Sequence, residues 1–335
     1  MSLLRLPPET LAQIFDYVGS SFFHEDLARL TVSKRWLEFA LPTCFKRVAL
    51  SPETLRSLAT SGGMKSRSPL ECNLEILDLE LRGYNSPCVT SNEGLANVSA
   101  ETWKDVLDGD LTQLGILARH SRKLRTLRIR ACSAPSPEAL DSSEAYLSLS
   151  TIQGFLSVQN LSVLVLDLPA YFPNSSKEGL HICPAVGTLL PTLHTLHIRM
   201  RTICPDILKP RISGSNLHLS IVAISLSLIT NQPGITSAAH SKRCGSLAGG
   251  LLQLKADLQE QAEALVSRMA APKTMRLLTH SLPLFEIQSL DVLTGKTMVL
   301  NDDAEWDEDG KTIIMEDSEP ESEIPDDEFS DFSEA

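Results

Sequence analysis

Apolar side chains in the first fifty residues recur at the three- and four-residue intervals that are typical of helices packed through one face. The pattern predicts a first helix after Pro7-Pro8, because proline fits the first helical turn, where its missing N–H is not needed. The apolar face of this helix is formed by Leu11, Ile14, Phe15 and Val18. We expect a short second helix over residues 25–30, and a third that begins after Ser33, a suitable N-cap, and stops before Pro42. Three helices in about 40 residues bury only a small core.

Residues 51–300 alternate helical and strand-like segments, among which a short phrase, L-x-x-L-x-L/I, recurs. Its clear copies begin at Leu74, Leu124, Leu161 and Leu193, and a weaker copy ends at Leu217-Leu219. Apolar segments of helical character precede three of these copies, at residues 111–117, 152–158 and 186–190. Units of this kind cannot bury their apolar faces alone, so we expect them to stack around one core and to form a parallel sheet.

The spacing of the phrase is compatible with two α/β architectures. Successive clear copies are 50, 37 and 32 residues apart, which exceeds the length of a regular leucine-rich repeat. We therefore predict an irregular, short α/β solenoid in which the long inserts are loops. An ordinary doubly wound α/β sheet is the alternative.

The C-terminal part of this region predicts one long helix and one hairpin. Apolar positions from Leu251 to Met269 follow helical spacing, and Pro272 ends the pattern. Residues 284–293 and 296–300 are predicted to form a hairpin around Thr294-Gly295, which would cover the edge of the sheet.

Charge separates the last 35 residues from the rest of the chain. Residues 301–335 hold 16 acidic side chains and one basic side chain, with few large apolar groups, so we expect a largely disordered acidic tail. The first 300 residues are nearly neutral, with 29 basic and 26 acidic side chains. Their lack of a long basic block argues against a dedicated nucleic-acid binder.

Composition narrows the classes of protein to which the chain could belong. The chain has 335 residues, 42% of them hydrophobic, which is enough for roughly two domains. It has seven cysteines without a CxxC pair, an N-terminus unlike a signal peptide, and no apolar run of about 18 residues. We therefore expect no membrane span and a reducing compartment, the cytoplasm or the nucleus.

The sequence contains no convincing pattern of residues for an active site, a metal site or a cofactor site. His181 and Cys183 share one strand face, but no second Cys/His pair at ligand spacing accompanies them, so a four-ligand metal site is not expected. His194 and His197 are expected on opposite faces of a strand. The basic cluster fits either an anion-binding patch or, as we favour, a solvated face of a repeat; it comprises Arg119, Arg122, Lys123, Arg125, Arg128 and Arg130.

The N-terminal segments LRLPPETLAQIFDYV and DLARLTVSKRW resemble the F-box motif. The matching residues are Leu6, Pro7, Glu9, Leu11, Ile14, Phe15, Val18, Asp26, Leu27, Leu30, Val32 and Trp36. One departure is the segment Gly19–His24, where the family often has a shorter turn with proline. The resemblance implies a three-helix unit that docks on the Skp adaptor of a cullin–RING ubiquitin ligase. It assigns docking, by contact or by shaping the unit, to Leu6, Pro7, Ile14, Leu27, Leu30, Val32 and Trp36.

The rest of the chain is similar to fungal F-box proteins with leucine-rich-repeat-like bodies, notably in THSLPLFEIQSLDVLTGKTMVL and AEWDEDGKT. The implied organisation is an F-box in residues 1–50, a substrate-binding body in 51–300 and an acidic tail in 301–335. The implied function is that of a non-catalytic specificity subunit that recruits a protein substrate to an SCF-type ligase. Two alternatives stay open: an F-box scaffold without a role in ubiquitination, and an α/β enzyme with an unrecognised site.

Overall fold

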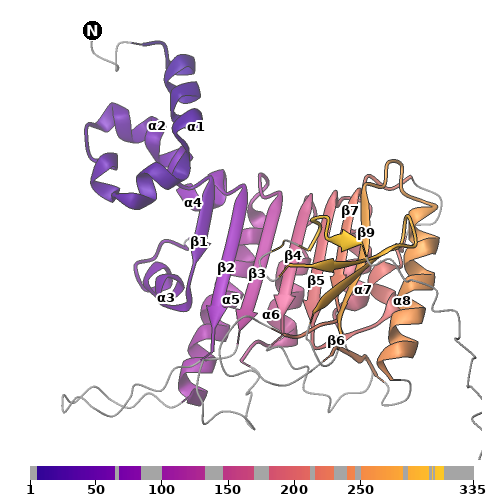
Figure 1. Ribbon diagram of the computed structural model, residues 1–335. Coiled ribbons are helices and arrows are strands. Elements are labelled where there is room, and N and C mark those ends of the chain that lie inside the picture. Colours follow the sequence, from indigo (N-terminus) through magenta and orange to yellow (C-terminus); the bar gives the residue numbers. More distant parts are fainter. Residues whose placement is uncertain are drawn as a thin grey trace, which may run out of the picture.

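The repeated phrase marks neighbouring strands of one large sheet. The computed structural model describes residues 6–64, 68–83, 100–132, 146–169, 181–211, 216–229, 240–245, 250–281, 286–301, 304 and 306–312. The parallel strands are β1 (Arg47–Leu50), β2 (Ile76–Arg82), β3 (Thr126–Cys132), β4 (Val163–Leu168), β5 (Thr195–Met200), β7 (Ile221–Ser225) and β9 (Thr274–His280). They lie side by side in the order of the sequence (Figure 1). A doubly wound sheet reverses its order at a switch point, so this sequential order excludes that alternative.

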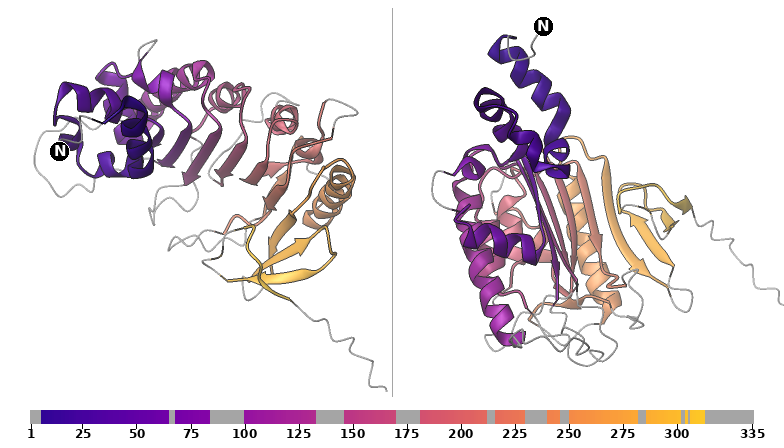
Figure 2. Two further views of the ribbon diagram at one scale, coloured as in Figure 1. Left: turned by 90° about the horizontal axis from the view of Figure 1, so that it is seen from above. Right: turned by 90° about the vertical axis from the view of Figure 1, so that its left-hand side faces the viewer.

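One face of the parallel strands is covered by helices (Figure 2, left). These elements are α3 (Pro52–Thr60), α4 (Pro69–Asn73), α5 (Ala100–His120), α6 (Leu149–Leu156), α7 (Cys183–Leu189), the 3-10 helix η3 (Pro205–Leu208) and α8 (Leu251–Val266). Serine side chains cap several of them; Ser51, for example, accepts a hydrogen bond from the backbone N–H of Thr54. The chain is therefore a mixed α/β protein with a large, mostly parallel sheet.

Strand register explains why the phrase is repeated. The middle leucine of each copy lies beside its counterpart on the next strand, in the row Leu77, Leu127, Leu164, Leu196, Val222 and Met275. The last position of each copy forms the next row: Leu79, Ile129, Leu166, Ile198, Ile224 and Leu277. All these side chains are almost fully buried, each contributing about 1.5–3 kcal/mol to folding.

Two copies of the phrase differ from the prediction. The fifth begins at Leu219 and continues through Val222 and Ile224, so the weak copy that ends at Leu217-Leu219 was placed too early. A sixth copy, which the sequence analysis did not predict, forms β9 with Pro272 in place of the leading leucine. Leu217 instead forms an isolated bridge with Met269, at the end of the segment that follows α8.

The C-terminal strands confirm the predicted hairpin and extend beyond it. Strands β10 (Ile287–Asp291) and β11 (Thr297–Leu300) pair antiparallel, with Gly295 at φ 71° in the turn, a conformation that glycine adopts without strain. Strand β12 (Lys311–Thr312) then pairs with β11, within the segment predicted as an acidic tail. Residues 313–335, the remainder of that segment, lie outside the described residues.

The N-terminal unit consists of α1 (Pro8–Glu25), the 3-10 helix η2 (Leu27–Leu30) and α2 (Lys34–Cys44). Its small core comprises Phe15, Phe23, Ala40 and Cys44. Gly19, at φ 80°, kinks α1 immediately after Val18, and Val18 is exposed instead of joining the buried stripe. The third helix does not stop before Pro42, because a proline in the last turn removes only one hydrogen-bond donor near the helix end. Strand β1 already belongs to the sheet, although the sequence analysis placed its residues in the N-terminal unit.

Candidate functional site

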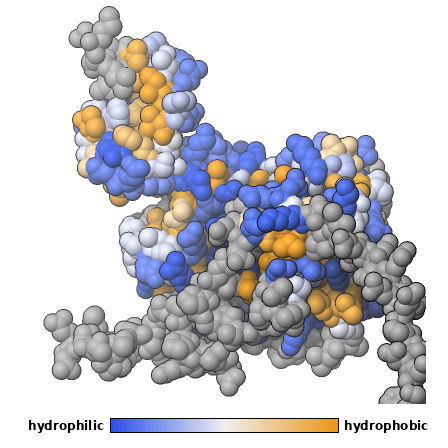
Figure 3. Space-filling model, in the orientation of Figure 1, coloured by the Kyte–Doolittle hydropathy of each residue, from blue (hydrophilic) through white to orange (hydrophobic). Residues whose placement is uncertain are grey.

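The N-terminal unit carries most of the large apolar side chains that are exposed in the described part of the chain. Within the described ranges, eight large apolar side chains are exposed, and six of them belong to this unit. We call these six the N-terminal apolar surface: Tyr17, Val18, Phe22, Leu27, Val32 and Leu37. Figure 3 shows apolar residues on the visible side of this unit, which stands away from the sheet. Exposed apolar groups gathered on one small unit are typical of a protein-binding surface.

The residues expected to dock an adaptor divide into two groups. Pro7, Leu27 and Val32 are exposed, and Leu27 and Val32 exceed 60% exposure. The others are half-buried: Leu6, Ile14, Leu30 and Trp36. The first group is available for direct contact, whereas the second shapes the unit.

Trp36 holds the N-terminal unit together. Its indole Nε1 donates a hydrogen bond of 2.6 Å to the backbone carbonyl of Arg29. Its ring packs edge-on against Phe15, with centroids 4.7 Å apart. Ser33 caps α2 by accepting from the backbone N–H of Trp36 at 3.1 Å, and Asp26 caps η2 by accepting from Ala28 at 2.9 Å. Replacing Trp36 would therefore disturb the unit itself as well as any surface it presents.

Ion pairs of Lys46 connect the unit to the β1 edge of the sheet (Figure 1). Lys46, between α2 and β1, lies 3.4 Å from Asp16 of α1 and 3.6 Å from Glu75, which precedes β2. Within the unit, His24 Nε2 of α1 lies 2.8 Å from the carbonyl oxygen of Cys44 at the end of α2, within hydrogen-bonding distance. The N-terminal apolar surface is thus presented by a unit that is held to the body.

The face of the sheet opposite the helices carries charged residues in register. Asp78 on β2 accepts hydrogen bonds from Arg47 Nε at 3.0 Å and from Arg128 Nη1 at 3.2 Å. Arg130 lies 3.9 Å from Glu80 on the same face. Two members of the predicted basic cluster are thus paired with carboxylates of the neighbouring strand, which favours the paired, solvated face over an anion-binding patch.

Residues after β11 lie over the other half of this face. The Trp306 ring lies 5.1 Å from the guanidinium carbon of Arg199, and Asp307 lies 3.8 Å from His197 Nε2. Asp309 forms an ion pair with Arg276 of β9. The segment thus reaches β5 and β9. His197 points to this face, whereas His194 precedes β5 and lies within 3.1 Å of the backbone carbonyl of His218.

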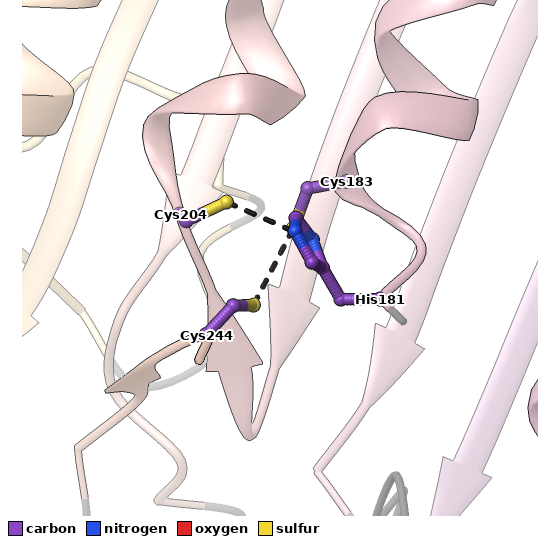
Figure 4. A group of neighbouring side chains, drawn as sticks. All are labelled: His181, Cys183, Cys204 and Cys244. Carbon is purple, nitrogen blue, oxygen red and sulfur yellow. Dashed lines mark hydrogen bonds between the residues drawn. The ribbon is translucent and has the colours of Figure 1, made fainter. Parts of the chain in front are cut away.

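A second group of functional side chains lies on the helix side of the sheet, where one histidine and three cysteines meet (Figure 4). One possible ligand atom of each lies within 4.8 Å of those of the others; the residues are His181, Cys183, Cys204 and Cys244. The sulfurs of Cys183 and Cys244 are 3.8 Å apart, and the Cys204 sulfur is 3.7 Å from His181 Nδ1. Contrary to the expectation from the sequence, two further side chains that could ligate a metal accompany His181 and Cys183.

The chain assembles this cluster from three separate segments. His181 and Cys183 lie at the start of α7, and Cys204 is the N-cap of η3. Cys244 follows β8 (Lys242–Arg243), a two-residue strand that pairs with β6 (Thr202–Ile203) and so lies beside the Cys204 segment. Both Cys183 and Cys204 directly precede a proline in the first turn of a helix, and this Cys-Pro pair is the feature that the two positions share in the sequence.

The three thiols of the cluster interact with one another. Hydrogen bonds with Cys183 and Cys244 hold the pKa of Cys204 well below that of an ordinary thiol. Hydrogen bonds with Cys204 and Cys244, together with burial, raise the pKa of Cys183. Among the three thiols, Cys204 is therefore the one that most readily loses its proton. The other two thiols donate hydrogen bonds to its sulfur.

Comparison with known proteins supplies no family for the chain. No protein-family model matches it, and no curated protein matches it. Among the helices of the described ranges, none has the length and apolarity needed to cross a bilayer. Function is therefore inferred from the N-terminal apolar surface and the sheet face on which charged residues are paired.

Proposed function

We propose that the chain is the substrate-recognition subunit of an SCF-type cullin–RING ubiquitin ligase, with residues 6–44 docking on a Skp-type adaptor as an F-box. The observation that carries the proposal is the concentration of exposed apolar residues on this helical unit, six of the eight in the described chain. Burial against a partner removes such side chains from water, at about 25 cal/mol per Å². The matching F-box residues of the sequence lie on the same unit.

The matching residues have different roles in the proposed docking. Leu27 and Val32 make direct contact, since both are mostly exposed and apolar. Trp36 positions them, because it ties α2 to the carbonyl of Arg29 through a hydrogen bond and packs on Phe15. Pro7 contributes contact at the start of α1, whereas the half-buried Leu6, Ile14 and Leu30 support the shape of the surface.

The body, in this proposal, is leucine-rich-repeat-like and binds the protein substrate. Stacked strand–helix units in sequence order support it, because repeat proteins of this type present an extended sheet face to their partners. The free stretch of that face carries the charged side chains of Arg47, Glu80 and Arg130, each at least half exposed. The ubiquitin-transfer chemistry would lie in other subunits, in the cytoplasm or the nucleus.

Adaptor binding by matched double variants tests the proposal. Leu27→Ser with Val32→Ser in the full chain removes two exposed contacts while leaving the core of the unit unchanged. Interface hot spots cost about 2 kcal/mol or more each, so affinity for a purified Skp-type adaptor should fall by at least about 30-fold. The matched control, Ile116→Ser with Leu252→Ser, changes the other two exposed large apolar residues of the described chain and should bind as the unmodified chain does.

Two outcomes of this experiment bear on the proposal in different ways. Undiminished binding by the folded Leu27/Val32 variant, or no binding by the unmodified chain, contradicts the docking assignment. If the adaptor binds but the reconstituted ligase transfers no ubiquitin to any partner captured by the body, the chain is an F-box scaffold. The melting temperature of each variant, measured in parallel, separates loss of binding from loss of fold.

A further inference from the structure

We propose that His181, Cys183, Cys204 and Cys244 form a structural zinc site that fastens α7, η3 and the β8 segment to one another. A site of this kind goes beyond the proposed function, since neither adaptor docking nor substrate binding requires a metal ion. Three cysteines and one histidine are a common donor set of structural zinc sites.

The spacing of the donor atoms fits a zinc tetrahedron. With zinc–sulfur bonds of about 2.3 Å, tetrahedral angles place two sulfurs about 3.8 Å apart, and a sulfur and a ligating nitrogen about 3.6 Å apart. The Cys183–Cys244 sulfur distance is 3.8 Å, and the distance from the Cys204 sulfur to His181 Nδ1 is 3.7 Å. Figure 4 shows the four side chains converging from three segments. All remaining donor pairs lie within 4.8 Å, so that shifts of about 1 Å close the site around an ion.

Other roles for these cysteines fit less well. A disulfide requires sulfurs about 2.05 Å apart, much closer than the 3.8 Å between Cys183 and Cys244. A catalytic zinc keeps one coordination position open for water, whereas here four protein donors are close enough to occupy all four positions. Cys183 and Cys204 are buried, which further favours a closed, structural ion.

Neighbouring groups support the ligands in the manner of a zinc site. The backbone N–H of Asp206, in the first turn of η3, hydrogen-bonds to the Cys204 sulfur. The Thr202 side chain likewise hydrogen-bonds to Cys244. Arg243, next to Cys244, forms an ion pair with Asp257 of α8, so the β8 segment is anchored from both sides. Donors to ligand sulfurs orient the ligands and stabilise their negative charge.

The position of the site defines its role. His181, Cys204 and Cys244 follow the carboxyl ends of β4, β5 and β7 in the sequence, respectively. Zinc bound there would hold this corner of the body together, and its binding free energy would be gained only in the folded chain. Removal of the metal should therefore lower the melting temperature of the body without altering residues 6–44.

Metal content of the purified full-length chain is the first test. Inductively coupled plasma mass spectrometry should find one zinc ion per chain after dialysis against a weak chelator. The Cys204→Ser and Cys244→Ser variants should lose the metal. Cys72→Ser is the matched control, because Cys72 is exposed on α4 and lies outside the cluster, and it should keep the metal.

Cobalt provides a readout that does not depend on the stability of the variants. Adding Co²⁺ to the unmodified chain after its metal has been removed by a strong chelator should produce the intense visible absorption of tetrahedral cobalt bound by thiolates. Zinc should abolish that absorption by displacement, and the Cys72→Ser chain should behave identically. An unmodified chain that carries no zinc and gives no tetrahedral cobalt spectrum would overturn the proposal. Stoichiometric iron with sulfide, or copper, in place of zinc would overturn the assignment of the ion.

Discussion

Arg199 and Asp167 meet through two hydrogen bonds of 2.7 Å, from Nε and Nη2 of the guanidinium to the two carboxylate oxygens. They occupy neighbouring strands, β5 and β4, and their side chains are only 15% and 10% exposed. Trp306 lies over the guanidinium, and Arg199 Nη1 also donates to the carbonyl of Ile229. This pair is bidentate and shielded, unlike the looser pair of Arg130 and Glu80 on the same face.

We expect Asp167→Asn to destabilise the chain by about 3 kcal/mol, because it leaves the largely buried guanidinium of Arg199 without its counter-charge. Glu80→Gln is the matched control and should cost less than about 1 kcal/mol, since its pair with Arg130 is exposed and 3.9 Å long. Urea unfolding of both variants measures the difference. Equal losses would show that shielding by Trp306 does not govern the strength of these pairs.

Gly187 marks a close approach between α7 and η3. A Cβ built there would lie 2.6 Å from the carbonyl oxygen of Lys209 and 2.9 Å from that of Asp206. Gly187→Ala should therefore destabilise the body by about 1–3 kcal/mol, because backbone atoms cannot yield as a flexible side chain would. Gly154→Ala in α6 meets nothing within 4 Å and should be neutral or stabilise by up to about 1 kcal/mol, through helix propensity alone. Thermal unfolding compares the two; a stabilising Gly187→Ala would contradict the close packing described here.

Sequence periodicity predicted the strands wherever the repeated phrase was intact. Leu74, Leu124, Leu161 and Leu193 are all fully buried, because each opens a unit whose next two phrase positions face the helices. The β9 copy is not recognisable by this pattern, because Pro272 stands in place of the leading leucine and Met275 in place of the second. The alternating leucines at 217 and 219 fit the pattern of a strand, although strand β7 begins only at Ile221.

The cysteine cluster could not be predicted in the same way. Cys204 and Cys244 are brought together by β6 and β8, strands of two residues whose pairing leaves no periodic signal. Spacing along the chain reveals a metal site when its ligands come in closely spaced pairs, and here only His181 and Cys183 are close in the sequence. The N-terminal unit shows the opposite case, since local helical spacing correctly predicted that Leu11 and Phe15 are buried.

His280 makes stability depend on pH. Burial, and then the nearby His240 ring stacked 3.6 Å away, lower the pKa of His280 from 6.5 to about 4. The unfolded chain therefore binds a proton before the folded chain does as pH falls. This contribution to stability is present above about pH 6.5 and is lost between pH 6.5 and 4, by at most about 3 kcal/mol.

In the variant His280→Gln, the free energy of unfolding should change less between pH 6.5 and 4 than it does in the unmodified chain. Free energies of unfolding in urea, measured at several pH values from 7 down to about 4, provide the comparison with the unmodified chain. His120→Gln, at an exposed histidine of α5, is the matched control and should leave the slope in place. An unchanged slope in His280→Gln would assign the acid sensitivity to other groups.

Two truncations separate residues 301–312 of the acidic segment from residues 313–335. Trp306 packs with Leu278 and Leu300 on the open sheet face, and Asp309 is the ion-pair partner of the buried Arg276. Ending the chain after Leu300 removes both contacts, so we expect a loss of about 3 kcal/mol or more, from lost packing and an uncompensated guanidinium. Ending it after Thr312 keeps these contacts and the pairing of β12 with β11, and should change stability by less than about 0.5 kcal/mol.

Urea unfolding of the two truncated chains measures both values, and Trp306→Ala in the longer one tests the packing contribution separately. If the two truncations were equally stable, residues 301–312 would contribute nothing to the fold, and their contacts with β5 and β9 would have no energetic weight.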